Sequence, residues 1–213
     1  KDVTLNYANL YALNKTSEIE DGLSAILGLD FKVNKKETKE EKLSLSIGQV
    51  FNYEKNKDVP NKSSLDQRMS DIVGEINYNF SEIGKIDYKF AVDHNLSDLN
   101  YNEISTELNF GLVQFNLDYL EEQNHRGKEH YVSSGVSLNF NDNNKLSFST
   151  KKNFKTDSTE LYNLNYQYSV DCLTAGLVYR REFYQDDDLG EKNSLMFTIT
   201  FVPFASINTP LSQ

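Results

Sequence analysis

The sequence is poor in cysteine, proline and tryptophan. Its 213 residues include one cysteine, three prolines and no tryptophan. The single Cys172 cannot form a disulfide within the chain, so it either pairs with a cysteine outside this segment or serves as a small apolar residue at a strand end. The longest apolar run has only a few residues, whereas a transmembrane helix needs about 20. We therefore predict no membrane-spanning helix.

Positive charge is also scarce, and it is dispersed. The 22 lysines and arginines are outnumbered by 32 aspartates and glutamates, which gives a formal net charge of −10. A nucleic-acid surface needs clustered basic residues, so no nucleic-acid partner is predicted. No phosphate-binding loop, dinucleotide fingerprint or Cys-x-x-Cys motif is present, so no cofactor is predicted. The chain starts at Lys1 without a signal sequence, and we expect a fragment of a longer protein.

Alternation of apolar and polar residues is what the sequence has in abundance. Between positions 22 and 34 the odd positions from Leu23 to Val33 are all apolar. The even positions hold glycine or a polar residue, with Ile26 as the exception. This period of two predicts a β-strand with one apolar face. Six alternating apolar residues span roughly the 9 to 11 residues that a tilted strand needs to cross a bilayer.

The same pattern predicts about twelve strands and no helix. They cover residues 3–7, 22–34, 43–53, 72–80, 86–92, 104–110, 113–119, 132–140, 146–154, 162–170, 173–183 and 193–203. Apart from the charged link at 35–41, long or charged connections (14–21, 54–68, 121–130, 185–192) alternate with tight turns (81–84, 111, 141–144, 169–172). Bacterial outer-membrane barrels show this alternation, with short periplasmic turns and long extracellular loops.

Alternation alone would also fit a soluble sandwich with a dry core. Regular hairpins, strands near ten residues and aromatic residues towards strand ends favour a membrane barrel, in which every backbone group is paired. We therefore predict an all-β, antiparallel up-and-down transmembrane β-barrel of about 12 strands, with residues 1–213 forming one barrel segment. The prediction requires Leu27, Leu29, Phe90 and Phe115 to face outward rather than into a dry interior.

The polar face of the strands supplies the candidate functional residues. If the apolar face meets lipid, this face lines an aqueous lumen, and its charged members are Asp71, Glu75, Lys89, Glu103, Glu107, Asp118, Lys151, Arg180 and Glu182. Two cations, Lys152 and Arg181, instead share the phase of the apolar residues. Both lie near the loop end of their strands, where such a cation costs about 0 to 1 kcal/mol rather than about 2 to 4 kcal/mol at mid-bilayer. They either touch lipid phosphates or simply snorkel to the interface.

Catalysis and metal binding have weak candidates only. The run Asp93-His94-Asn95-Leu96-Ser97 holds a serine near a histidine, but it falls where a strand enters a loop, without nearby glycines for an oxyanion hole. His125 and His130 with Glu129 form the other cluster, in a loop without a further ligand motif. No enzyme and no metal site are predicted. A passive porin or generic channel is the alternative function, because the same strands would serve it.

Short motifs in a fixed order carry a family resemblance. They are residues 9–22 followed by a strand with Gly28, then Ser46-Ile47-Gly48-Gln49, Ser63-Ser64 and residues 70–74, and finally residues 166–181 with Asp171-Cys172 and Tyr179-Arg180-Arg181. Together they resemble the C-terminal barrel of the LPS-assembly outer-membrane protein, the LptD family. The resemblance implies that this chain is roughly the C-terminal half of a large barrel that assembles lipopolysaccharide into the outer leaflet of the outer membrane.

The resemblance also implies partners and a lateral exit. The partners would be lipopolysaccharide, a plug lipoprotein like LptE and a periplasmic bridge protein like LptA. Lipid would leave sideways through a seam at the last strand, here 193–203, with Leu195, Phe197, Ile199 and Phe201 on its apolar face. The family often has two adjacent cysteines, bonded to its N-terminal domain, where this chain has Cys172 followed by Leu173, so at most one such interdomain disulfide is expected.

Overall fold

A computed structural model describes residues 7, 10, 22–55, 64–80, 82–123, 129–183, 192–201 and 205–211. These residues form twelve strands and no α-helix. The strands are β1 (Ser24–Asn34), β2 (Glu41–Asn52), β3 (Ile72–Asn79), β4 (Gly84–Val92), β5 (Leu99–Asn109), β6 (Val113–Glu122), β7 (His130–Asn141), β8 (Asn144–Asn153), β9 (Ser158–Val170), β10 (Leu173–Glu182), β11 (Lys192–Phe201) and β12 (Ala205–Leu211).

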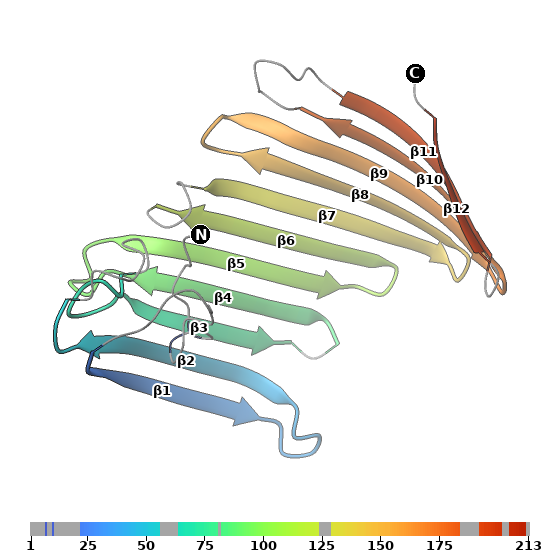
Figure 1. Ribbon diagram of the computed structural model, residues 1–213. Coiled ribbons are helices and arrows are strands. Elements are labelled where there is room, and N and C mark those ends of the chain that lie inside the picture. Colours follow the sequence, from blue (N-terminus) through green and yellow to red (C-terminus); the bar gives the residue numbers. More distant parts are fainter. Residues whose placement is uncertain are drawn as a thin grey trace. The chain divides into compact units, whose positions relative to one another are not determined.

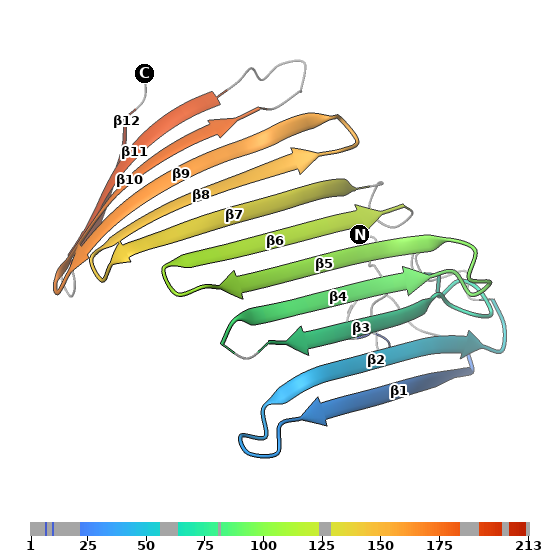
Figure 2. The same cartoon turned by 180° about the vertical axis from the view of Figure 1, so that it is seen from behind.

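The strands follow sequence order in an antiparallel, up-and-down sheet (Figures 1 and 2). The chain divides into two compact units. The first unit comprises residues 1–105 and 119–130, and the second comprises residues 106–118 and 131–213. The predicted all-β, up-and-down class is confirmed.

The first unit pairs β1 to β4 in a continuous register. Leu29 lies opposite Ile47, and Asp30 lies opposite Ser46, so apolar residues share one face and polar residues share the other. The polar face continues from Ser46 to Glu75 and from Glu75 to Lys89 on the next two strands. The predicted separation of faces is therefore present in this unit.

The second unit repeats the arrangement through β7 to β12. In β10, Leu177 lies between Tyr166 of β9 and Phe197 of β11 on the apolar face. Arg180 lies between Asn163 and Ser194 on the polar face. Along β9 the even positions from 162 to 170 are exposed while the odd positions from 161 to 169 are half-buried, which is the alternation of a sheet with two distinct faces.

The apolar face is exposed rather than packed into a core. Leu27 and Leu29 are 65% and 62% exposed. Phe90 and Phe115 are half-buried, and neither belongs to the buried core. Burial of these four residues together in a dry interior would have contradicted the predicted outward orientation. They do not form such an interior.

Connections differ in length between the two ends of the strands. At one end, called the long-loop end, the connecting segments are 53–71, 93–98 and 123–129 in the first unit and 154–157 and 183–191 in the second. At the opposite, short-turn end they are 35–40 and 80–83 in the first unit and 110–112, 142–143, 171–172 and 202–204 in the second. The predicted alternation is present at the long connections 53–71, 123–129 and 183–191, whereas 35–40 and 154–157 depart from it. The predicted connection 14–21 lies outside the described residues.

The last strand was predicted wrongly. The stretch 193–203 was expected to end the sheet, but β11 is followed by β12, which pairs with it from Leu195↔Leu211 to Phe201↔Ala205. Residues 205–211 hold Pro210 and little apolar alternation, so their strand character comes from pairing with β11. Proline within a sheet is tolerated on an edge strand, and β12 is the last strand of the order. The first predicted strand, 3–7, lies outside the described residues except for Tyr7.

Candidate functional site

The polar face of the first unit brings three of the predicted lumen residues together. Glu75 on β3 lies opposite Lys89 on β4. The Lys89 ammonium lies 3.8 Å from a carboxylate oxygen of Glu103 on β5. Glu75, Lys89 and Glu103 thus form a row of alternating charge across three strands, with side chains that reach solvent. Such a row can bind polar groups of a ligand without creating a large field of one sign.

Asp71, which was predicted to belong to the same lining, lies in a different environment. It is only 3% exposed. Its carboxylate accepts a hydrogen bond from the Asn100 side-chain amide at 2.8 Å, and its backbone N–H donates to the Ser64 hydroxyl at 2.9 Å. The prediction for Asp71 needs correction, because this side chain is enclosed by protein and is not exposed to water.

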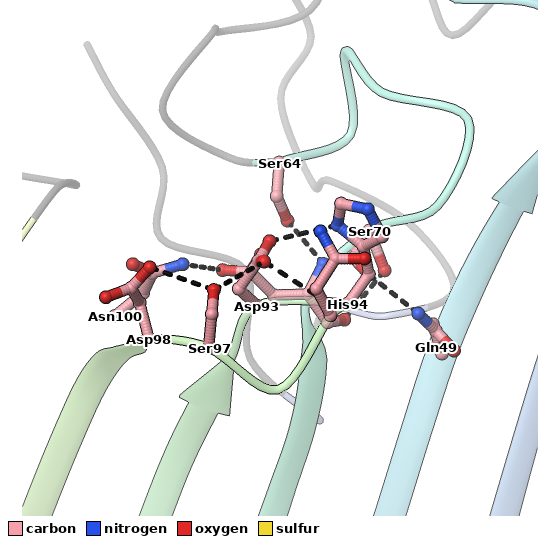
Figure 3. A network of polar contacts seen from close by, with 10 residues as sticks. Gln49, Ser64, Ser70, Asp93, His94, Ser97, Asp98 and Asn100 are labelled. Carbon is pink, nitrogen blue, oxygen red and sulfur yellow. Dashed lines mark hydrogen bonds and ion pairs between the residues drawn. The ribbon is translucent and has the colours of Figure 1, made fainter.

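The enclosure is held by a set of side-chain hydrogen bonds to backbone (Figure 3). The Ser70 hydroxyl accepts from the Val50 N–H and donates to the Asp71 carbonyl, and the Gln49 amide donates to the Ser70 carbonyl. The Asn52 amide lies 2.8 Å from the carbonyls of both Leu65 and Gln67. These bonds fix residues 64–71 against β2 and satisfy backbone groups that burial would otherwise leave unpaired.

Beneath this segment lies an apolar cluster. Its strand residues occupy polar-phase positions, that is, positions on the face of the strand that otherwise carries polar residues. Its members are Leu10, Val50, Leu65, Val73 and Ala91, with Tyr7, Ile26 and Tyr101 packed against it. The cluster explains why Ile26 breaks the alternation of its strand, because Ile26 packs against buried apolar residues and not against water. We name this feature the inner core. The lumen prediction missed it, although apolar residues at polar-phase positions of adjacent strands were the available signal.

Two residues near the start of the chain contribute to the inner core. The Tyr7 hydroxyl donates to the Asp30 carboxylate at 2.7 Å, and Asp30 also accepts from the Ser46 hydroxyl. Leu10 packs so closely on Gly48 that a Cβ at position 48 would collide with the Leu10 side chain. A larger residue at 48 would therefore require the end of the Leu10 side chain to move, so this glycine serves close approach rather than a turn.

In the second unit, the predicted lumen residues lie on a more open polar face. Lys151 lies 3.1 Å from Glu160 and 4.2 Å from the centre of the Tyr131 ring. Arg180 forms an ion pair with Glu182. Glu107 is exposed near the end of β5, and Asp118 is half-buried on β6. The residues are spread over β5, β6, β8 and β10, which suits an extended surface rather than a compact catalytic site.

The seam residues Leu195, Phe197, Ile199 and Phe201 all lie on β11. Each faces a partner on β10, from Tyr179 to Leu173, and β12 covers the other edge of the strand. A strand with two paired neighbours is not an edge, so an opening at the end of this sheet would be at β12.

Cys172 lies in the two-residue turn between β9 and β10, at the short-turn end. It is exposed and carries a free thiol. Its position leaves it accessible to another chain segment, and the interdomain disulfide stays a prediction.

The candidate serine and histidine both bind Asp93 (Figure 3). The His94 Nδ1 lies 2.9 Å from one Asp93 oxygen, and the Ser97 hydroxyl lies 3.2 Å from the other. Burial works against ionisation, yet the Asn95 amide, the Ser97 hydroxyl and His94 together lower the pKa of Asp93. Because the Ser97 hydroxyl binds the carboxylate and not the imidazole, these contacts do not form an imidazole-activated nucleophile. They stabilise the loop 93–98, and we name them the loop brace.

The described residues contain no cluster of three or more histidine, cysteine, aspartate or glutamate side chains suited to a metal ion. His130 contacts the Tyr119 hydroxyl at 3.1 Å, while His125 lies outside the described residues. The same ranges hold no helix with the length and apolar character to cross a membrane.

Comparison with known proteins gives one family. The profile of LptD, described as LPS transport system D, matches residues 1–131. This match covers the whole first unit, including the inner core, whereas the motifs at 166–181 lie beyond it. No curated protein matches the chain.

Proposed function

The chain belongs to the LptD family, and from this membership we propose that it is part of the outer-membrane translocon that assembles lipopolysaccharide into the outer leaflet. Lipopolysaccharide is amphipathic, so a protein that moves it must provide a polar path for sugars and phosphates and an apolar surface for acyl chains. The proposal assigns these tasks to the two faces of the strands.

The observation that carries the proposal is the outward exposure of the apolar face. Twenty-four large hydrophobic residues are exposed among the described residues, against five buried hydrophobic residues in the core. On adjacent strands the exposed Tyr166, Leu177 and Phe197 lie side by side, and exposed apolar residues grouped in this way mark a membrane or protein contact. Paired strands with an apolar outer band are the form in which β-structure resides in a bilayer.

The polar face supplies the hydrophilic path in this proposal. Glu75, Lys89 and Glu103 in the first unit and Lys151 and Arg180 in the second would meet the sugars and phosphates of the passing lipid. The long-loop end faces the cell exterior in the proposal, as in outer-membrane barrels generally.

The lateral exit is proposed at the edge of β12. An unpaired strand edge is costly in lipid, so this edge must normally pair with the first strand of the complete barrel. Because only backbone hydrogen bonds would close such a seam, it can open and let acyl chains enter the bilayer while sugars stay on the polar side.

Partners follow from the same family membership. We propose a plug lipoprotein like LptE within the complete barrel and a periplasmic bridge like LptA that delivers the lipid. Cys172 would form the single disulfide to the periplasmic part of the protein, from the short-turn end.

Crosslinking in the full-length protein tests the exit. Cysteines at Ile207 and in the first barrel strand should form a bond that stops lipopolysaccharide from reaching the cell surface, measured on intact cells. The control is a bond between Ile199 and Ile207, which are register partners within the sheet and should not separate during export. Normal export with the first bond fully formed would refute the seam.

A passive channel is the competing function, since a polar inner face would also pass small solutes. Depletion of the protein separates the two. Loss of surface lipopolysaccharide with unchanged solute uptake supports assembly, whereas reduced uptake with normal surface lipopolysaccharide supports a channel.

A further inference from the structure

Two cations interrupt the apolar face of the second unit near the same end of its strands. Lys152 is the next-to-last residue of β8, and Arg181 is the next-to-last residue of β10. β8 and β10 run in the same direction, because each is antiparallel to β9. Both cations therefore lie at the long-loop end, in phase with outward-facing residues such as Phe148 and Tyr179.

Each cation is followed by a phenylalanine two positions later. In Lys152-Asn153-Phe154 the ammonium lies 5.5 Å from the ring centre, and in Arg181-Glu182-Phe183 the guanidinium carbon lies 4.6 Å from it. A ring face beneath a cation attracts it electrostatically. The repeated contact holds both charges beside the outer surface instead of letting them extend freely into water.

The intervening strand completes the surface with Tyr162. This residue lies opposite Arg181 in the register, and its ring packs edge-on against Phe183 at 5.6 Å and stacks near Phe148 at 6.1 Å. Lys152 lies opposite Thr159 and Arg181 lies opposite Tyr162, so their α-carbons are about 10 Å apart across the sheet and about 10 Å apart along it at standard strand spacings. Their long side chains can therefore converge on one anionic group.

We propose that Lys152 and Arg181, with the rings of Phe154, Tyr162 and Phe183, form an outer rim site for the phosphate group of a membrane lipid. The rings would pack on the upper acyl and sugar region, and the two cations would bind the phosphate oxygens. Phosphate is a suitable ligand for both cations, since arginine binds it through paired N–H donors and lysine binds it as a point charge. The assignment of this rim to the outer leaflet, and so to lipopolysaccharide, rests on the proposed function.

A carboxylate among the described residues competes for the Lys152 ammonium. Asp157 lies 2.9 Å from the Lys152 ammonium in the turn that follows β8, and its side chain is 86% exposed. Ion pairs this exposed are weak, so a lipid phosphate can displace or share the contact. The carboxylate thus sets a moderate affinity that suits a lipid able to exchange.

Lipid retention by the full-length protein in detergent tests the site. The probes are lipid A carrying its phosphates and the same lipid after dephosphorylation, with bound lipid counted by native mass spectrometry. Replacing each cation, K152Q or R181Q, should weaken retention about fivefold, and the pair about twenty-five-fold, given about 1 kcal/mol for each basic residue at an anionic lipid surface. The conservative pair K152R/R181K should retain the lipid.

A matched control removes the same charge from the opposite face of the same unit. K145Q/K192Q changes two lysines of β8 and β11 that lie opposite the polar-face residues Gln167 and Glu182, and neither belongs to the proposed lipid path. Its retention should match that of the unmodified protein. Equal losses from both double variants would overturn the proposal, because total charge and not the rim would then determine binding.

Asp157→Asn sharpens the test, because it removes the competing carboxylate. Asp157 has a positive φ of 47°, a conformation that asparagine also accepts, so the turn should persist. Retention of phosphorylated lipid should rise severalfold, and unchanged retention would count against the proposed geometry. Millimolar inorganic phosphate should not displace the lipid, since free phosphate lacks the contacts with the rings; full displacement would show a simple anion site and overturn the lipid assignment.

The outcome is separable from the proposed function. Normal surface export without phosphate-dependent retention would refute the rim site alone. Phosphate-dependent retention in a protein whose depletion leaves surface lipopolysaccharide unchanged would refute the export role alone.

Discussion

The two units differ in what lies on the polar-phase face of their strands. Every buried side chain of the described residues belongs to the first unit, including the inner core and the polar residues Ser70, Asp71 and Asn100. The second unit has ion pairs and half-buried polar residues on that face, and only glycines 135 and 176 are buried there. The same strand pattern therefore supports a packed inner face in one unit and an open one in the other.

The difference shows that alternation determines on which face of the sheet a residue lies, but not whether that face is dry or exposed to water. In the first unit, Leu10 and residues 64–71 fold over the strands and exclude water. Val73 and Ala91 then occupy polar-phase positions at no cost, because they pack against apolar neighbours instead of facing water. The second unit has no such cover among its described residues, and its polar-phase positions remain hydrophilic.

The largest expected effect comes from placing a charge in the inner core. Val73 has 0% exposure, so Val73→Asp would bury a carboxylate without a partner and destabilise the protein by about 3–5 kcal/mol. We expect little protease-resistant barrel in the outer membrane. The control is V178D in the second unit, the same replacement at a polar-phase position, which should assemble normally. Equal loss from both variants would remove the distinction between the units.

The contact between Leu10 and Gly48 gives an intermediate effect. Gly48→Ala would force the Leu10 side chain away, at a cost of about 1–3 kcal/mol for overpacking. Leu10→Ala makes room, so G48A should cost much less in the L10A background. Urea unfolding of the four proteins in detergent measures this coupling. Additive effects would show that Leu10 does not pack on β2.

The ion pair between Lys89 and Glu103 gives a smaller effect. Both side chains are partly exposed, so the pair is expected to contribute about 0.2–1 kcal/mol. Glu103→Lys places two cations together and should lower stability by a similar amount. The exchanged pair K89E/E103K should restore it. Because screening by salt weakens exposed pairs, the difference should shrink in 1 M salt; no change with salt would indicate a packing effect.

The smallest effect concerns the loop brace at Asp93. Hydrogen bonds lower its pKa in the folded state despite the opposing effect of burial. A carboxyl with a lowered folded pKa stabilises the protein above its unfolded value and loses this contribution as the pH falls through the folded value. Stability should therefore decline slightly more below the ordinary value of 3.8 in the native protein than in D93N. Identical pH profiles would show that the brace contributes nothing.

Much of the fold was predictable because strand periodicity is local. The eleven predicted strands within the described residues correspond to β1 through β11, and the phases of Leu29, Glu75 and Lys152 follow directly from position. β12 was missed because a short segment with Pro210 has little pattern of its own. Its strand character depends on the neighbouring β11.

The candidate site was predictable in part. The row of Glu75, Lys89 and Glu103 follows from the alternation alone, since paired strands place their polar residues on the same face of the sheet. Asp71 has the same phase, yet it is buried. Its burial depends on Ser64, which meets it when the segment 64–71 folds back, and on Asn100, which is distant in sequence. Ile26 was the visible exception that pointed to this inner core.

The order of residues by itself determined that this chain forms strands, which side of each strand is apolar, and where the connections are long or short. These properties depend on neighbours one or two positions away. The tertiary structure alone decided that part of the inner face is dry, that β11 has a further partner, and that Tyr162 packs beside Phe183 opposite Arg181. These outcomes arise from contacts between distant segments, and their free energy is gained only when chain closure has brought both partners together.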